Sequence, residues 1–151
     1  MAASFDRDLM IVLNDVARLV RTRFDQRARA YGMTRAQWLI LARLNRQPGL
    51  SQNEMAAICE VEPITVGRLI DRLEARGLVE RRADPSDRRV RRLHLLPAAM
   101  PIIEEITRYK ELLHDEIVEG VSAADYPRVV EALLTIKNNL TAEPKLAMAG
   151  E

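Results

Sequence analysis

The chain has few of the residues that mark special classes of protein. Only one of its 151 residues is cysteine, and the aromatic residues are two Phe, one Trp and three Tyr. A lone cysteine, Cys59, cannot form an internal disulfide, so a reducing compartment is expected. The apolar runs are far shorter than the roughly 18 residues needed to span a bilayer. The N-terminal MAASFDRDLM lacks the basic and apolar regions of a signal peptide. These absences predict a cytoplasmic protein that does not enter membranes.

The motifs of enzymes and metal sites are missing as well. The sequence contains no nucleophile motif, no glycine-rich phosphate loop and no His–carboxylate constellation. His94, His114 and Cys59 lack the spacing of metal ligands. We therefore expect no enzymatic activity, no cofactor and no metal site.

The charge is small in total but unevenly distributed. The formal net charge is +1, yet residues 76–92 hold seven arginines against three acids, a local charge of +4. The rest of the chain therefore carries about −3. Because a polyanion responds to local concentration of charge, this segment points to nucleic acid as a partner.

Apolar residues recur with a period near 3.6, which predicts helices. Thr34 with Gln37 and Ser51 with Glu54 have the spacing of capping boxes, and Pro63 suits the first position of another helix. The expected helices cover residues 5–30, 34 to about 48, 51–59, 63 to about 77, 97 to about 119 and 122 to about 140.

Two short strands are expected between the fourth and fifth helices. LVERR (78–82) and VRRLHLL (90–96) flank the turn-prone ADPSDRR (83–89). Asp84 and Pro85 suit the first two positions of a type I turn, so their simplest interpretation is a hairpin tip. A two-stranded ribbon cannot bury itself, so it must lie against the third and fourth helices.

The third and fourth helices with their short turn form a helix-turn-helix, and the ribbon makes it winged. At about 100° per residue, the fourth helix has an apolar face of Val66, Leu69, Ile70 and Leu73. Its outward face carries Ile64, Thr65, Arg68, Asp71, Arg72 and Ala75. Such a face suits the major groove of DNA. Alternatively, Arg68 and Arg72 pair with Asp71, Glu62 or Glu74 on a solvated surface.

The stretch ITVGRLIDRLEARGLVERRADPSDRRVRRLHL (64–95) resembles the MarR family of bacterial transcription regulators. In that family a recognition helix ending in D-x-L-E-x-x-G-L-V-x-R runs into a wing written D-P-x-D-R-R. The resemblance covers residues 9–140, and VEPITVGRLIDRLE is most similar to the SlyA-like branch. The family's L-T-x-x-G after the wing is replaced by Leu96-Pro97-Ala98-Ala99-Met100, so the start of the fifth helix is expected to differ.

The resemblance implies a mainly α fold with a small β-ribbon, in one MarR-like domain over residues 1–151. A winged core at 34–96 is flanked by dimerisation helices at 5–31 and 98–140. It further implies a homodimer that binds a pseudo-palindromic operator, as a repressor or anti-repressor, in a nucleoid-associated cytoplasmic pool. The apolar stripes of the terminal helices exceed what a winged domain alone needs, which also indicates a dimer. The alternative function is a winged-helix module for protein–protein contact.

Particular residues are expected to contact DNA. Thr65 and Arg68 are expected at base edges, with Arg72 shared between bases and phosphates. Backbone donors near Ser51 and Pro63 are expected to hold phosphates. In the wing, Arg88, or else Arg89, is expected in the minor groove. Asp84 or Asp87 is expected to brace these arginines, because a carboxylate repels phosphate.

Regulation is suggested by two further features. Family members often bind phenolic or other aromatic carboxylates, and Arg18, Arg21 and Trp38 would match such a site. Alternatively, Trp38 belongs to the core, which is the more common place for such a residue, and the arginines belong to the dimer interface. Redox sensing through Cys59 is an alternative, although a buried structural cysteine is more common at such a place. The family's peroxide-sensing cysteine lies near the N-terminus, where this chain has none.

Overall fold

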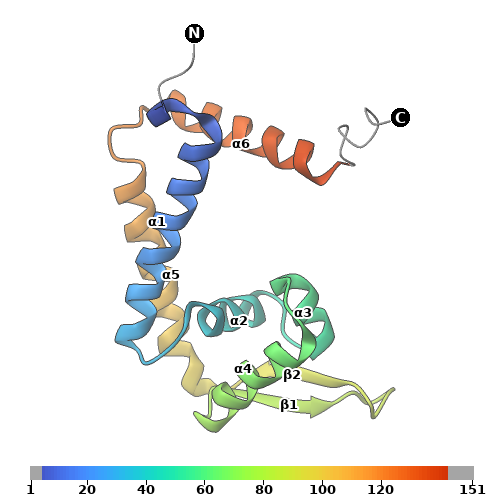
Figure 1. Ribbon diagram of the computed structural model, residues 1–151. Helices are drawn as coiled ribbons and strands as arrows, with labels where there is room; N and C mark the ends of the chain where they lie inside the picture. Colours follow the sequence, from blue (N-terminus) through green and yellow to red (C-terminus); the bar gives the residue numbers. More distant parts are fainter. Residues whose placement is uncertain (1–4, 143–151) are drawn as a thin grey trace, which may run out of the picture. The chain divides into compact units, whose positions relative to one another are not determined.

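The computed structural model describes residues 5–142. It is mainly helical with one two-stranded ribbon, as predicted (Figure 1). The elements in order are a 3₁₀ turn (Phe5–Arg7), α1 (Leu9–Ala30), α2 (Arg35–Arg46), α3 (Gln52–Cys59), α4 (Pro63–Ala75), β1 (Val79–Ala83), β2 (Arg91–Leu95), a second 3₁₀ turn (Pro97–Ala99), α5 (Met100–Ile117) and α6 (Asp125–Thr141).

The chain divides into two compact units, residues 1–108 and residues 109–151, with the boundary inside α5. The first unit contains the helix-turn-helix, the ribbon and α1. The second contains the end of α5 and α6. The functional division into a core at 34–96 and dimerisation helices at 5–31 and 98–140 stays a prediction.

Both predicted capping boxes are present. The Thr34 hydroxyl accepts from the Gln37 N–H at 3.2 Å, and the Gln37 side chain accepts from the Thr34 N–H at 2.9 Å. Ser51 and Glu54 exchange the same two bonds at 3.1 and 2.7 Å. Each box satisfies two backbone donors that a helix start otherwise leaves unpaired, which fixes where α2 and α3 begin.

The expected single helix over 5–30 is interrupted near its start. The Asp8 carboxylate accepts from the N–H groups of Met10 and Ile11, at 3.0 and 3.2 Å, so α1 begins after Asp8 and a separate 3₁₀ turn precedes it. An Asp in the extended conformation is a strong N-cap, and it ends any helix that arrives from before it.

The start and end of α4 are as expected. Pro63 is its first residue, and Gly77 follows its end with φ of +70°. The Gly77 N–H donates to the Glu74 carbonyl at 2.9 Å, and the Leu78 N–H to the Leu73 carbonyl at 3.0 Å. This left-handed glycine turns the chain directly into β1.

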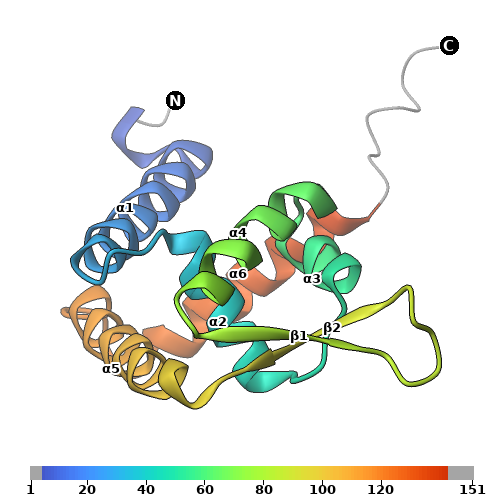
Figure 2. The ribbon, with the colours of Figure 1, turned by 90° about the horizontal axis from the view of Figure 1, so that it is seen from below.

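The ribbon is antiparallel, with Val79 opposite Leu95 and Arg81 opposite Leu93. The loop before α3 extends it, because the Leu93 N–H donates to the Leu50 carbonyl and its carbonyl accepts from Gly49. The fully buried side chains that join α2, α3, α4 and the ribbon are Ile40, Leu41, Leu44, Met55, Val66, Ile70, Leu73, Val79 and Leu93. The turn between the strands lies at the free end of the ribbon, away from these helices (Figures 1 and 2).

The last two helices begin differently from the expected positions. A 3₁₀ turn over Pro97–Ala99 precedes α5, and a difference from the family at the start of this helix stays a prediction. The buried apolar positions in α5 are Ile103, Ile106 and Leu113. α6 begins at Asp125, three residues after Ser122, because Ser122 caps a preceding turn and accepts from the Asp125 N–H at 3.1 Å. In residues 5–142, no helix is both long and apolar enough to cross a membrane.

Candidate nucleic-acid interface

α4 has one buried and one exposed face, as its sequence predicts. Val66, Ile70 and Leu73 are buried, while Leu69 is half-buried. The residues of the opposite face are all exposed: Ile64, Thr65, Arg68, Asp71, Arg72 and Ala75. The helix therefore packs on one side and presents a polar side with two arginines to solvent.

Arg68 and Arg72 lie on the exposed face of α4. Over residues 5–142, neither forms an ion pair or a side-chain hydrogen bond, so the expected alternative of pairing with Asp71, Glu62 or Glu74 is wrong. Asp71 and Glu74 are instead occupied by Arg81, at 2.7 and 3.4 Å. Two unpaired guanidinium groups on an exposed helix face can donate to bases or phosphates.

Arg81 joins three elements and was not singled out from the sequence. Arg81 belongs to β1, and its guanidinium forms an ion pair with Asp71 of α4 and donates to the Gly67 carbonyl of the same helix at 3.1 Å. It also donates to the Gln52 side chain of α3 at 3.4 Å. α3 approaches α4 closely at Gly67, since a Cβ there would lie 2.9 Å from the Gln52 amide nitrogen. Arg81 thus fixes the recognition helix against both the helix before it and the wing.

The turn of the wing is built on the Asp84 side chain. Asp84 is only 7% exposed, and one carboxylate oxygen accepts from the Ser86 N–H, the Ser86 hydroxyl and the Asp87 N–H. The hydrogen-bonded backbone turn is at 87–90, where the Val90 N–H donates to the Asp87 carbonyl at 3.0 Å. Asp84 therefore makes a side-chain turn where the sequence predicted the first position of a type I turn.

The other Asp84 oxygen holds Arg92. The Arg92 Nε lies 2.5 Å from it, and the Arg92 Nη1 donates to the Gly49 carbonyl at 3.0 Å. The bonds from Ser86 and Arg92 hold the pKa of the Asp84 carboxyl well below its usual range. Asp84 thus braces Arg92 and ties the wing to the loop before α3, whereas the sequence predicted a brace for Arg88 or Arg89.

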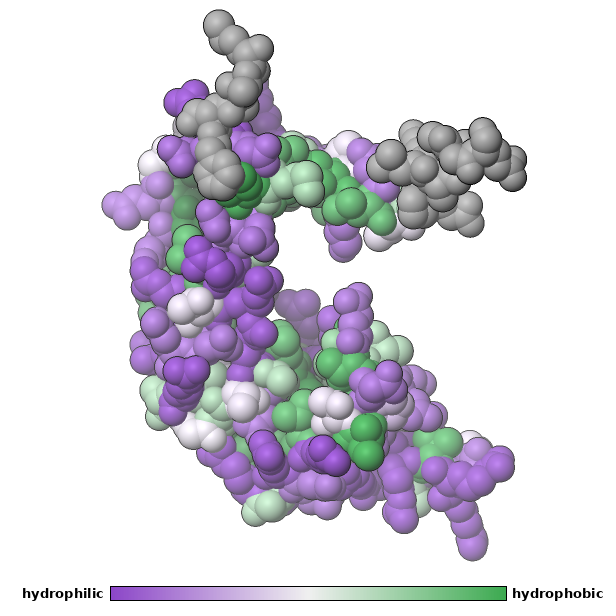
Figure 3. Space-filling view, viewed as in Figure 1, coloured by the Kyte–Doolittle hydropathy of each residue, from purple (hydrophilic) through white to green (hydrophobic). Residues whose placement is uncertain are grey.

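The tip of the wing presents its arginines to solvent. Arg88 and Arg91 are exposed and form no ion pair or side-chain hydrogen bond within residues 5–142. Arg89 is also exposed, with its Nε 3.2 Å from Asp87, so Asp87 does contact one of the two predicted arginines. Hydrophilic side chains cover this end of the ribbon in Figure 3.

The seven arginines between 76 and 92 therefore have three different environments. Arg76, Arg81 and Arg92 bond to backbone carbonyls and hold elements together. Arg82 and Arg89 are exposed beside Glu80 and Asp87. Arg88 and Arg91 form no ion pair or side-chain hydrogen bond in the part of the chain that the structure describes. A contact of this segment with nucleic acid stays a prediction, and the local charge of +4 includes arginines that the fold uses to hold its own elements together.

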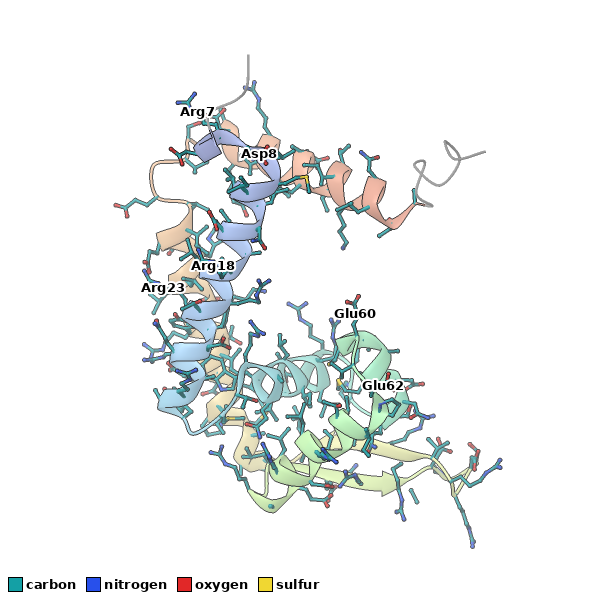
Figure 4. All side chains as sticks on the ribbon, in the orientation of Figure 1. Arg7, Asp8, Arg18, Arg23, Glu60 and Glu62 are labelled. Atoms are coloured by element: carbon teal, nitrogen blue, oxygen red, sulfur yellow. The ribbon has the colours of Figure 1, made fainter. Side chains whose placement is uncertain are left out.

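The two predicted phosphate positions differ in quality. Ser51 has both its N–H and its hydroxyl engaged in the capping box. A hollow of about 210 Å³ beside it is lined by Ser51, Gln52, Asn53, Arg89, Val90 and Arg91. At α4, the side chains of Glu60 and Glu62 project near the helix start (Figure 4), and Pro63 has no N–H to donate. Because Arg89 and Arg91 line the hollow beside Ser51, that position suits a phosphate better than the start of α4, which lies near two carboxylates.

The residues expected to bind an effector lie in different surroundings: Trp38 is buried, whereas Arg18 and Arg21 are exposed. Trp38 is 2% exposed and its ring lies 5.9 Å from the Tyr31 ring, so it belongs to the core. Arg18 projects from the middle of α1 (Figure 4) and lies 3.3 Å from Asp15. Arg21 is exposed on the same helix. A ligand role for Arg18 and Arg21 stays a prediction.

The surroundings of Cys59 do not favour redox sensing. Burial raises the pKa of the Cys59 thiol, and the nearby Arg43 only partly offsets this. A raised pKa lowers the fraction of thiolate, which is the reactive form. In the part of the chain that the structure describes, no group of three or more His, Cys, Asp or Glu residues could hold a metal ion.

Known proteins with a similar sequence and fold indicate the family of this chain. The model of the MarR family matches residues 31–90. The solved structure of the transcriptional regulator PA3341 is 31% identical, with a TM-score of 0.76, and the match covers 88% of this chain and 98% of that one. The chain belongs to the MarR family. Members of this family are non-enzymatic, DNA-binding transcription factors, so the predicted absence of an enzymatic role follows from membership.

More distant members share the fold. SlyA is 23% identical with a TM-score of 0.77, over 88% of this chain and 94% of its own. BpsR of Bordetella bronchiseptica, whose DNA binding is regulated by 6-hydroxynicotinic acid, is 24% identical with a TM-score of 0.75, over 91% of this chain and 98% of its own. Because SlyA is less identical to this chain in sequence than PA3341 is, assignment to the SlyA-like branch stays a prediction.

Proposed function

We propose that this MarR-family regulator binds a pseudo-palindromic operator as a homodimer and acts as a repressor or anti-repressor. α4 enters the major groove with Thr65, Arg68 and Arg72, and the wing reaches the minor groove with Arg88. The observation that carries this proposal is the set of unpaired arginines on two separate exposed surfaces, one on α4 and one at the ribbon tip. Two such surfaces match one duplex, which offers a major groove beside a minor groove.

A homodimer supplies two copies of each surface. Apolar side chains remain exposed on α1, α5 and α6, among them Leu9, Val16, Leu19, Leu112, Val129, Leu133 and Leu134. A two-fold axis would place two recognition helices about one helical turn of DNA apart, which is why the operator should be pseudo-palindromic.

The test combines selection with salt titration. Duplexes bound by the purified protein are selected from a random pool, and the affinity for the selected sequence is measured at several salt concentrations. We expect an inverted repeat and a steep loss of affinity with salt, because neutralised phosphates release counterions. The alternative, a protein–protein module, would show no salt-sensitive affinity for any duplex and would overturn this proposal.

We also propose that a small aromatic carboxylate releases the DNA. The regulation of BpsR by 6-hydroxynicotinic acid and the exposed Arg18 and Arg21 support this chemistry. The salt titration is repeated with 6-hydroxynicotinate and with 4-hydroxybenzoate, using cyclohexanecarboxylate as the control. Equal effects of all three acids, or none, would contradict an aromatic effector.

A further inference from the structure

Ile64 is an apolar residue in an unusual place on α4. Its side chain is 66% exposed, and it is the one large hydrophobic residue of this fully described helix that is exposed. It occupies the second position of the helix, directly after Pro63. A single exposed aliphatic side chain needs no explanation in itself, so its neighbours decide its significance.

Packing within the chain does not account for Ile64. The positions of a hydrophobic staple at this helix start belong to Val61 and Val66, and Val66 is fully buried. At about 100° per residue, Ile64 lies roughly 200° around the helix from Val66, which places it away from the core face.

Ile64 instead belongs to the face with the unpaired polar side chains. Arg68 lies one turn later and only about 40° around the helix from it, and Thr65 is the next residue. Both are exposed, and neither side chain has an ion pair or hydrogen bond within residues 5–142. The first turns of a recognition helix are the part that reaches base edges.

Thymine is the base that offers an apolar group in the major groove, its 5-methyl. We infer that Ile64 reads a thymine by packing against this methyl group, beside the base contacted by Arg68. This rests on the proposed placement of α4 in the major groove. Residues four apart lie about 6 Å apart along a helix, and base pairs stack about 3.4 Å apart, so the thymine should lie within about two base pairs of the Arg68 contact.

The test replaces each thymine of the selected half-site by deoxyuridine, which removes the methyl group and leaves the hydrogen-bonding groups of the base in place. Replacement of the one thymine that Ile64 contacts in the half-site should make the wild-type protein bind roughly fourfold more weakly than it binds the unmodified operator, which is the effect expected for one buried methyl group. The Ile64→Ala variant should bind the thymine operator more weakly than the wild type does. Its affinity should not change when that thymine is replaced by deoxyuridine.

Leu39→Ala is the matched control, because Leu39 is an exposed aliphatic residue on α2. It should keep the full sensitivity to deoxyuridine. Equal sensitivity of Ile64→Ala and the wild type at every position, or a half-site without thymine, would overturn the inference while leaving DNA binding intact. Loss of salt-sensitive binding by the wild-type protein would instead overturn the proposed function itself.

Discussion

α4 and α6 are both amphipathic helices, but the apolar face of α4 is buried and that of α6 is exposed. α4 buries Val66, Ile70 and Leu73 against neighbouring elements of its own unit. α6, which is longer, has no buried residue at all, and Val129, Val130, Leu133 and Leu134 stay between 37% and 49% exposed. Apolar side chains lie along α6 in Figure 3.

The difference shows which face of each helix is available to a partner. The apolar face of α4 is buried in the core, so the face of α4 that stays exposed is the polar one, which suits DNA. α6 offers an apolar face that the second unit leaves uncovered, which suits a second copy of the chain. One helix is thus fitted for a charged partner and the other for an apolar one.

The largest effect should come from placing a charge on the apolar face of α6. Leu134→Asp should convert the proposed dimer to monomers, because a carboxylate buried in an apolar interface loses its hydration without gaining a partner. Operator affinity should fall with it, since two half-sites are then bound independently. Sedimentation and DNA titration at the same protein concentrations measure both changes.

Asn139→Asp is the control for this change. It adds the same charge to the same helix at an exposed residue outside the apolar stripe, and it should leave the association state unaltered. A Leu134→Asp variant that sediments like the wild-type protein would place the partner surface elsewhere.

A smaller effect is expected on the polar face of α4. Arg68→Ala should reduce the difference in binding free energy between operator and random DNA by roughly 1–3 kcal/mol for each lost base contact. Arg29→Ala removes an exposed arginine from α1 and should leave that difference unchanged. An unchanged specificity ratio in Arg68→Ala would show that Arg68 does not read bases.

Much of the winged region could be predicted because its signals are local. The capping boxes at Thr34 and Ser51, Pro63 and Gly77 each act within a few residues of the boundary that they set. Asp8 shows where such prediction fails. The apolar period continues through this position, so the sequence predicts one helix, whereas Asp8 caps α1 and separates it from the preceding turn. The start of α6 was placed three residues early because Ser122 caps a turn that does not continue directly into the helix.

The roles of the arginines could not be predicted, because they depend on partners distant in the sequence. Arg92 contacts the carbonyl of Gly49, and Arg81 contacts Gln52. In the sequence these arginines look no different from Arg88, which has no such partner. Charge density identified the segment, and only the fold distinguishes its structural arginines from those that are available.

The wing extends the comparison to a second polar surface. Arg88→Ala should weaken binding and reduce the slope of log affinity against log salt by about one unit for each wing that reaches DNA. Arg82→Ala is the matched control, because that guanidinium lies beside Glu80, 2.5 Å away. If the two variants keep the wild-type slope, the wing does not neutralise phosphate.

The smallest effect concerns an ion pair between α1 and the first half of α5, Arg27 with Glu105. Glu105 accepts from Arg27 and from Arg108, and these bonds lower the pKa of its carboxyl to about 2. The pKa in the unfolded chain is about 4.3, so the ionised carboxylate stabilises the fold above that pH, and the contribution is lost as the pH falls toward 2.

Glu105→Gln should therefore be less stable than the wild-type protein at pH 7, and its free energy of unfolding should fall less between about pH 4.5 and pH 2. Urea unfolding at fixed protein concentration measures this, because association also contributes to stability. Glu104→Gln, at an exposed neighbour, should keep the wild-type pH dependence. Parallel curves for Glu105→Gln and the wild-type protein would mean that this carboxylate contributes nothing to the attachment of α1.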